Sequence, residues 1–168
     1  MPALTALLHT HNDALRLGRA LETLYACDQI VIVDHDSHDA TVQVARQYGA
    51  TVVSAQPDAC PADYLQSANH GLVRGWILCL TASESLSESL ATSLFELKLQ
   101  LKSESNAEQK PAAYSIHLRE ETADGWIDHP TPQTRLIFHT WSRWMGNLPA
   151  DDPDAVALEG ELLRFTLP

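Results

Sequence analysis

Short apolar runs alternate with amphipathic segments along the first part of the chain. Four runs are rich in aliphatic residues and too short for helices, which is typical of strands buried on both faces: residues 3–9, 30–33, 51–54 and 76–80. The segments between and after them have helical periodicity: about 13–24, 39–48, 61–73 and 87–101. This alternation predicts a parallel sheet whose strands are joined by helical crossovers.

The first of these helices has a well-defined apolar stripe. The pair Asn-Asp at 12–13 is a typical N-cap, and the stripe behind it consists of Leu15, Leu17, Leu21 and Leu24. We therefore expect these four leucines to face the sheet.

Beyond residue 111 the alternation of strands and helices gives way to strands alone. The apolar runs there predict an antiparallel addition to the sheet: 112–118, 124–128, 134–139 and 161–167. Residues 102–111 (KSESNAEQKP) are polar and predict a surface loop. Together the pattern predicts one domain, 1–168, with a three-layer α/β fold and a mostly parallel central sheet.

Composition narrows the class of protein. The 168 residues carry a formal charge of −11, which argues against nucleic-acid binding because phosphate backbones are bound by clustered Lys and Arg. Three cysteines without a CxxC pair indicate reduced thiols and favour a cytoplasmic protein over a disulfide scaffold. No run approaches the roughly 20 apolar residues of a membrane span, and the opening MPALTALL reads as a strand.

The stretch IVIVDHDSHDAT, which begins at residue 30, places a polar cluster at the end of an apolar strand. One interpretation is helix capping, with Ser37 or His38 before a helix whose first turn holds Asp39. A second is a metal site that uses His35 and His38, although adjacent residues of one turn seldom converge on one ion. A third is that Asp34 accepts hydrogen bonds from a ligand, such as a nucleoside, at the edge of the sheet.

Five segments, in this order, carry a family pattern: LHTHND at 8–13, VDHDSHDAT at 33–41, ARQYGATV at 45–52, 69–84, and QTRLI at 133–137. They are similar to I-P-T-Y-N-E, V-D-S-G-S-x-D-G-T, A-x-x-Y-G-A-x-V, N-x-G-L-x-x-A-x-G-D-W-V-L-x-L-D-A-D-E and Q-x-R-L-F. These are motifs of the family 2 glycosyltransferases, which have the GT-A fold. The chain resembles this family through about residue 90 and in patches afterwards, and the order and spacing of the segments make the resemblance specific.

The resemblance implies a GT-A-like, nucleotide-diphospho-sugar transferase-like fold that binds a nucleotide sugar at the carboxyl ends of its first strands. The residues that it implies around the nucleotide are Thr10, Asn12, Asp34 and Asp36. The residues that it implies for acceptor or phosphate binding are Gln133 and Arg135. Asp39 and Thr41 would mainly shape the start of the following helix.

The chain departs from the family at the D-x-D motif, where 81–83 read Thr-Ala-Ser. In the family this motif holds Mn²⁺ or Mg²⁺, which neutralises the departing diphosphate. Glu84 remains as the candidate metal ligand, and its alternative use is to flank the start of the next helix. The candidate general base is Asp151 or Asp152, in LPADDPDA, which otherwise predicts a solvated turn.

Two functions therefore follow from the sequence. The first is a family 2 glycosyltransferase-like protein that binds a nucleotide-diphosphate sugar and transfers the sugar with inversion, with a divalent metal if it is active. The second is a catalytically inactive relative that acts as a binding or partner module, because fold alone does not fix function. Metal-dependent binding of nucleotides would separate the two.

Overall fold

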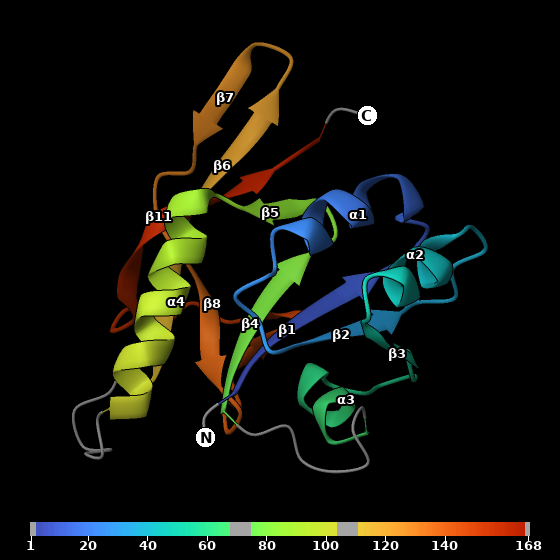
Figure 1. The fold of residues 1–168 in the computed structure, drawn as a ribbon, viewed down its shortest axis with the longest axis horizontal. Helices are drawn as coiled ribbons and strands as arrows, with labels where there is room; N and C mark the ends of the chain where they lie inside the picture. Colours follow the sequence, from blue (N-terminus) through green and yellow to red (C-terminus); the bar gives the residue numbers. More distant parts are fainter. Residues whose placement is uncertain (1–2, 68–74, 104–110, 167–168) are drawn as a thin grey trace.

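A computed structural model describes residues 3–67, 75–103 and 111–166. Within these residues a nine-stranded mixed sheet forms the centre of the molecule (Figure 1). Eight strands follow one another across it in the order β3 (Thr51–Ser54), β2 (Gln29–Asp34), β1 (Ala3–Thr10), β4 (Gly75–Thr81), β8 (Gln133–Phe138), β6 (Ala113–Thr122), β11 (Val156–Arg164) and β5 (Glu84–Leu86). The ninth strand, β7 (Gly125–Asp128), pairs with β6 alone, and β9 (Trp144–Met145) and β10 (Leu148–Pro149) form a separate small sheet.

The direction of the strands confirms the prediction of a mostly parallel sheet. Strands β1 to β4, β6 and β11 run one way, and β5, β7 and β8 run the other way. The three strands of opposite direction all come after the polar turn that follows β4. The antiparallel addition therefore joins a parallel β3-β2-β1-β4 unit, whose carboxyl ends lie at one edge of the sheet.

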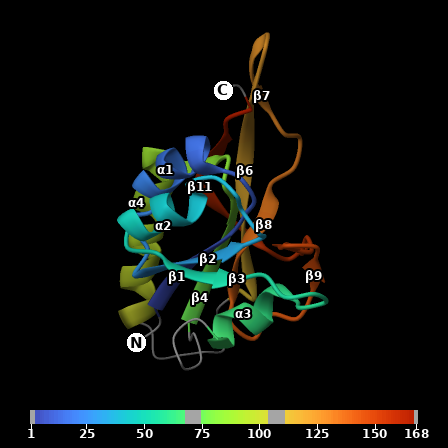
Figure 2. The same ribbon diagram turned by 90° about the vertical axis from the view of Figure 1, so that its right-hand side faces the viewer.

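Helices cover both faces of the sheet (Figure 2). Helices α1 (Ala14–Glu22), α2 (Thr41–Gln47) and α4 (Glu88–Ser103) lie on one face, and α3 (Pro61–Ser67) lies on the other. The three-layer α/β fold is thus confirmed. Among the helices of the described residues, none combines the length and the apolar character that a membrane crossing requires.

Alternation along the strands divides the core into two clusters. On β1, Leu4 and Leu8 pack in the cluster under α1, α2 and α4, whereas Leu7 packs in the cluster under α3. Neighbouring β4 does the same with Leu80 on the first face and Cys79 on the second. Both faces of the parallel unit are buried, which explains why its strands read as continuous apolar runs.

Four sequence-based predictions differ from the structure. Leu15 is 99% exposed, because α1 begins at Ala14 and Leu15 lies on its outer side, so the other three leucines of the stripe are buried and Leu15 is not. Glu84 begins a short strand, residues 84–86, and so does not directly flank α4, which begins at Glu88. The last strand begins at Val156, earlier than expected. A surface loop was predicted at 102–111, but residues 102 and 103 belong to α4, and 104–110 lie outside the described residues. The end of the helix predicted at 61–73 also lies outside the described residues.

A buried ion pair connects β5 with β8. Arg135 donates from its two terminal nitrogens to the two carboxylate oxygens of Glu84 at 2.7 and 2.9 Å, and the side chains are 1% and 0% exposed. The remaining donors of Arg135 reach the side-chain oxygen of Gln133 and the carbonyl of Cys79. Arg164 on β11 adds a contact to Glu84 at 3.0 Å. Four strands therefore meet at one satisfied polar network.

Burial opposes the negative charge of Glu84, yet its pKa is lowered. The hydrogen bonds and charge of Arg135, the amide of Thr81 and the charge of Arg164 together outweigh the cost of burial. Because the folded-state pKa lies below the ordinary value of 4.5, the pair stabilises the fold above that pH. This stabilisation is lost as acid protonates the carboxylate.

Strand β11 contains an irregularity beside the start of α4. Its register with β6 shifts between Ala157 and Glu161, as in a β-bulge. Gly160 within the shift has a φ of +99°, and a β-carbon at this position would lie 2.3 Å from the backbone nitrogen of Leu90. The close approach of β11 to α4 therefore depends on glycine.

We expect Arg135→Met to lower the free energy of unfolding by about 3–5 kcal/mol, because removal of one partner leaves a buried charge short of compensation. The measurement is urea denaturation at pH 7. Arg143→Gln is the matched control, since it removes an arginine from an exposed contact at 2.8 Å to Asp152 and should cost less than about 1 kcal/mol. Equal losses for the two variants would contradict the structural role of the pair.

We expect Gly160→Ala to lower the melting temperature more than Gly125→Ala does. Both glycines have positive φ, so both variants carry backbone strain of about 1 kcal/mol. Only Gly160 also meets a neighbouring backbone, whereas nothing lies within 4 Å of a β-carbon at Gly125. Thermal unfolding followed by circular dichroism compares the pair, and an equal shift would show that α4 moves away without cost.

Candidate functional site

The carboxyl ends of β1 and β2 bring two of the predicted nucleotide-binding residues together. Thr10 and Asp34 are register partners in this parallel pair, and the Thr10 hydroxyl donates to Asp34 Oδ1 at 2.8 Å. Ser37, which follows β2, donates its hydroxyl to Oδ1 at 2.6 Å and its amide to Oδ2 at 3.0 Å. Asp34 thus fixes the turn that leaves the strand.

Asp34 is 8% exposed, and it remains ionised in this setting. Burial raises its pKa, but the hydrogen bonds from Ser37 and Thr10, with the nearby His35, outweigh burial and lower the pKa overall. Helix capping does not involve this carboxylate. Its two oxygens are instead held in fixed directions at the sheet edge.

Asn12 and Asp36 lie on two loops that hold each other. Both have left-handed backbone conformations, with φ of 51° and 53°, which Asn and Asp tolerate better than most residues. Asn12 Oδ1 accepts the amide of His38 at 2.8 Å, and the Asn12 amide donates to the Ser37 hydroxyl at 2.9 Å. Asp36 is exposed and lies 3.6 Å from the His38 ring. All four predicted nucleotide-binding residues therefore lie at this edge.

Asp39 and Thr41 organise the starts of the two helices behind these loops. Asp39 accepts the amides of Thr41 at 2.9 Å and Ala14 at 3.2 Å, and the Thr41 hydroxyl accepts the amide of Asp13 at 2.8 Å. These contacts satisfy amides at the N-termini of α1 and α2. The predicted cap was therefore wrong in its residues: α2 begins at Thr41, so Asp39 precedes its first turn, and Ser37 bonds to Asp34. Asp39 itself supports the starts of both helices.

A pair of histidines lies on the α3 side of the same edge. His9 Nδ1 and His35 Nε2 are 2.8 Å apart, and the edge of the His9 ring contacts Tyr64 with ring centroids 5.9 Å apart. Burial, with the adjacent His35, lowers the pKa of His9 to about 4, so this ring is neutral at pH 7. His9 carries no signal in the sequence, because its partner is 26 residues away and only the register of β1 and β2 joins them.

The residues at the position of the D-x-D motif do not fit a divalent cation. Thr81 and Ser83 contact each other through their hydroxyls at 3.1 Å, and hydroxyls are weak substitutes for carboxylates as ligands of hard cations. Both oxygens of Glu84 face guanidinium groups inside the core, which argues against its predicted metal role. Among the described residues, no group of three or more His, Cys, Asp or Glu is arranged to hold a metal ion.

The two residues predicted to bind acceptor or phosphate belong to the same buried network. The donors of Arg135 are used by Glu84, Gln133 and the carbonyl of Cys79, and the side chain is 1% exposed. Gln133 supplies the oxygen that accepts two of those hydrogen bonds. A ligand phosphate would have to displace Glu84, so this geometry argues for a structural role of both residues.

The candidate general bases lie in a turn beside β8. Asp151 accepts the amide of Thr134 at 3.0 Å, and Asp152 accepts the amide of Asp154 at 2.9 Å and a guanidinium hydrogen bond from Arg143 at 2.8 Å. Both contacts of Asp152 lower its pKa, and the amide of Asp154 has a larger effect than the guanidinium of Arg143. Asp152 is therefore a weak base, and its geometry agrees with the turn interpretation.

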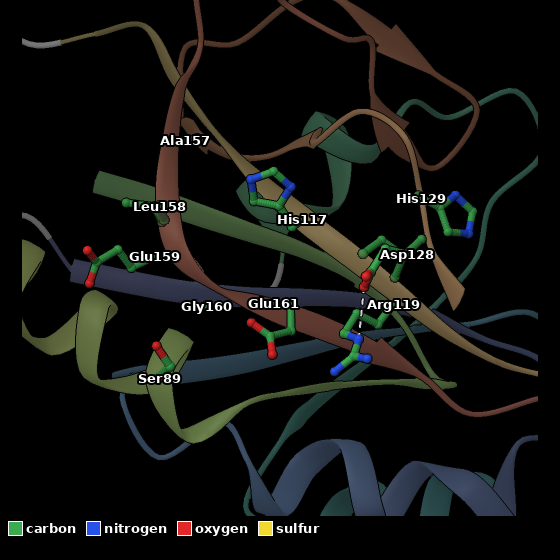
Figure 3. Close-up of a pocket in the computed structure, with 11 residues that line it drawn as sticks. Ser89, His117, Arg119, Asp128, His129, Ala157, Leu158, Glu159, Gly160 and Glu161 are labelled. Atoms are coloured by element: carbon green, nitrogen blue, oxygen red, sulfur yellow. Dashed lines mark ion pairs between the residues drawn. The ribbon is translucent and has the colours of Figure 1, made fainter. Parts of the chain in front are cut away.

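A separate open depression of about 860 Å³ lies over β6 and β11 (Figure 3). Arg119 and Asp128 form an ion pair at 2.8 Å on one side of it, and Glu161 and His117 project from neighbouring strands. The bulge at Gly160 forms its floor toward α4. None of the predicted site residues lines this depression.

Two solved structures are partly similar to this chain. Mannosyl-3-phosphoglycerate synthase from Rubrobacter xylanophilus is 23% identical with a TM-score of 0.44, over 71% of this chain and 40% of that one. TarS from S. aureus is 17% identical with a TM-score of 0.46, over 79% of this chain and 39% of that one.

Curated relatives are found by sequence, while no family model matches the chain. A protein of Rickettsia felis named an uncharacterized glycosyltransferase is 34% identical over 91 residues, which are 54% of this chain and 32% of that protein. A protein of Rickettsia prowazekii with the same description is 30% identical over 91 residues, 54% of this chain and 31% of that one. The match spans about a third of the length of each relative. Over about half of its length the chain is therefore a relative of proteins named glycosyltransferases, which confirms the resemblance predicted from its motifs.

Proposed function

We propose that the chain binds a nucleotide-diphosphate sugar, as a glycosyltransferase-like protein, at the carboxyl edge of β1 and β2. One observation carries this proposal: Thr10 and Asn12 at the end of β1 lie at one edge with Asp34 and Asp36 at the end of β2, and hydrogen bonds hold Thr10 to Asp34 and Asn12 to the loop that contains Asp36. Ligands of α/β sheets bind at this edge, beyond the ends of the strands. The relatives named glycosyltransferases support the class of ligand.

Asp34 has acceptor capacity left for a ligand. A carboxylate offers about four acceptor positions, two on each oxygen. Oδ1 accepts the hydroxyls of Thr10 and Ser37, whereas the Ser37 amide is the one donor to Oδ2 among the residues that the structure describes. The open position on Oδ2 suits a donor such as a ribose hydroxyl or a base N–H, and the exposed Asp36 and Asn12 side chains flank it in the two loops.

Transfer of the sugar with inversion is the finer part of the proposal. It requires a base close to the acceptor hydroxyl and a positive group close to the leaving diphosphate. Asp151 is the better suited of the two candidate bases, since it is exposed and, within the described part of the chain, accepts a hydrogen bond from a single amide. If Mn²⁺ or Mg²⁺ takes part, it binds residues other than Glu84, because that carboxylate is enclosed by arginines.

The alternative function is a binding or partner module without transfer activity. The enclosure of Glu84 by Arg135 and Arg164, together with the hydroxyls at Thr81 and Ser83, favours it. Both functions share the fold, and they differ in whether a nucleotide sugar binds and turns over.

We expect titration calorimetry to detect binding of at least one of UDP-glucose, dTDP-glucose, ADP-glucose and GDP-mannose. Asp36→Asn keeps the left-handed backbone but removes one charge, and Asp34→Asn replaces an acceptor oxygen with a donor. We expect Asp34→Asn to weaken binding by roughly tenfold or more, since an unsatisfied ligand donor costs about 1–3 kcal/mol. Asp36→Asn should have a smaller effect.

Asp124→Asn, in the turn between β6 and β7, is the matched control and should bind as the wild type does. Circular dichroism establishes that Asp34→Asn is folded before its affinity is compared. No binding of any sugar nucleotide, with Mn²⁺, Mg²⁺ or chelator, would contradict the proposed function and favour the module. Unchanged affinity in Asp34→Asn would remove Asp34 from the site.

A further inference from the structure

The histidine pair lies beside the position where the family holds its metal. His9 is the register partner of Thr81, the first residue of the segment that replaces the D-x-D motif, and His35 directly follows β2. On β1 and β4, residues 7 and 79 face α3, so His9 and Thr81, two residues further along each strand, lie on that face too. The pair therefore lies next to the end of β4, which is the place that the family resemblance implies for the diphosphate.

One ring nitrogen of His35, Nδ1, is available to donate a hydrogen bond to a ligand. His9 is neutral, and its Nδ1 accepts from His35 Nε2 whenever that nitrogen carries a proton. The amide of His35 donates to the Thr10 carbonyl at 2.8 Å, which fixes the backbone behind the ring. Within the described residues no partner is found for His35 Nδ1, and the ring is half-buried. A His35 ring protonated on both nitrogens would thus be held by His9 through Nε2 and would keep Nδ1–H as a donor for a ligand.

We propose that His35, as an imidazolium, binds the diphosphate of the nucleotide sugar, and that His9 is the positioning residue that holds the His35 ring. This inference rests on the proposed function of the same edge. The imidazolium supplies the positive charge that a metal ion supplies in the family, and no bond is made or broken in the step. Binding takes up a proton, so it is independent of divalent metal and strengthens as the pH falls.

Other charged and titratable groups surround the pair. Asp34 on β2 attracts a positive His35, although it lies on the opposite side of the strand. Nδ1 of His11 contacts the carbonyl of His35, and Asp36 with His38 forms an exposed pair in the loop that follows. From α3 the pair meets Tyr64, whose hydroxyl is bound to the backbone of Gln56, and from β4 it meets the uncharged Thr81.

His9 has a second feature that agrees with a positioning role. Its Nε2 is buried and has no hydrogen-bond partner among the described residues. Because this nitrogen is closed off, His9 cannot itself contact the diphosphate in this arrangement. The ligand contact therefore falls to His35, and His9 acts through the bond at 2.8 Å.

The test is calorimetry of the full chain with the four sugar nucleotides named above, at pH 5.5 and 7.5, with chelator present. The diphosphate of a sugar nucleotide is esterified at both ends and does not titrate in this range, so the pH dependence reports the protein. For the wild type we expect affinity at least severalfold higher at pH 5.5 than at pH 7.5, because only the imidazolium form supplies the positive charge. Measurements in two buffers with different ionisation enthalpies should show uptake of about one proton.

Variants separate the roles of the two rings. His35→Gln should bind weakly at both pH values, whereas His35→Lys keeps a cation and should bind at both without pH dependence. His9→Phe removes the acceptor but keeps an aromatic ring beside Tyr64, so its binding should be weaker than that of the wild type and should remain stronger at pH 5.5 than at pH 7.5. His117→Gln, on the distant sheet face, should match the wild type.

The outcomes distinguish this inference from the function on which it rests. Binding that requires Mn²⁺ or Mg²⁺, or that is equal at the two pH values, would overturn the role of His35 and leave nucleotide binding intact. Equal pH profiles for His35→Gln and the wild type would overturn it as well. Absence of binding at either pH, in the presence of metal or chelator, would overturn both.

Discussion

The ion pair between Glu84 and Arg135 is the contact on which the arrangement of the sheet depends. Glu84 follows β4 by a tight turn, yet its strand, β5, pairs with β11 at the far end of the strand order. The sheet must therefore curve so that β5 lies close both to the end of β4 and to β11. The guanidinium of Arg135 donates hydrogen bonds to Glu84 on β5 and to the carbonyl of Cys79 on β4. The parallel unit and the antiparallel addition are thereby tied by charge as well as by strand pairing.

This contact also explains the limits of prediction from sequence. The parallel unit could be predicted, because each of its strands is an apolar run with both faces buried. The roles of Glu84, Gln133 and Arg135 could not, because a charged residue in a sequence gives no sign of a partner about 50 positions away that removes it from water. The prediction that Leu15 faces the sheet was wrong for a related reason: helical periodicity identifies an apolar stripe but does not fix the residue at which the stripe begins.

The candidate site combines a local contact with long-range ones. In the structure Thr10 and Ser37 hold the carboxylate of Asp34, and Ser37 is only three residues away in the sequence. The role of Asp34 toward a nucleotide stays a prediction. The pair of His9 and His35 was invisible, since one ring belongs to a strand end and the other to the following strand's loop. Only the register of β1 against β2 makes them neighbours.

The hydrogen bonds between the loops after β1 and β2 affect how a ligand or partner could bind at this edge. Asn12 Oδ1 accepts a hydrogen bond from the backbone amide of His38, and the backbone amide of Asn12 donates one to the hydroxyl of Ser37, so the loops after β1 and β2 are ordered by each other. A partner that docks there meets a surface already shaped, and the entropy of ordering the loops is lost when the chain folds and not when it binds. Warming that loosens the first turns of α1 and α2 would therefore erode recognition before the sheet itself unfolds.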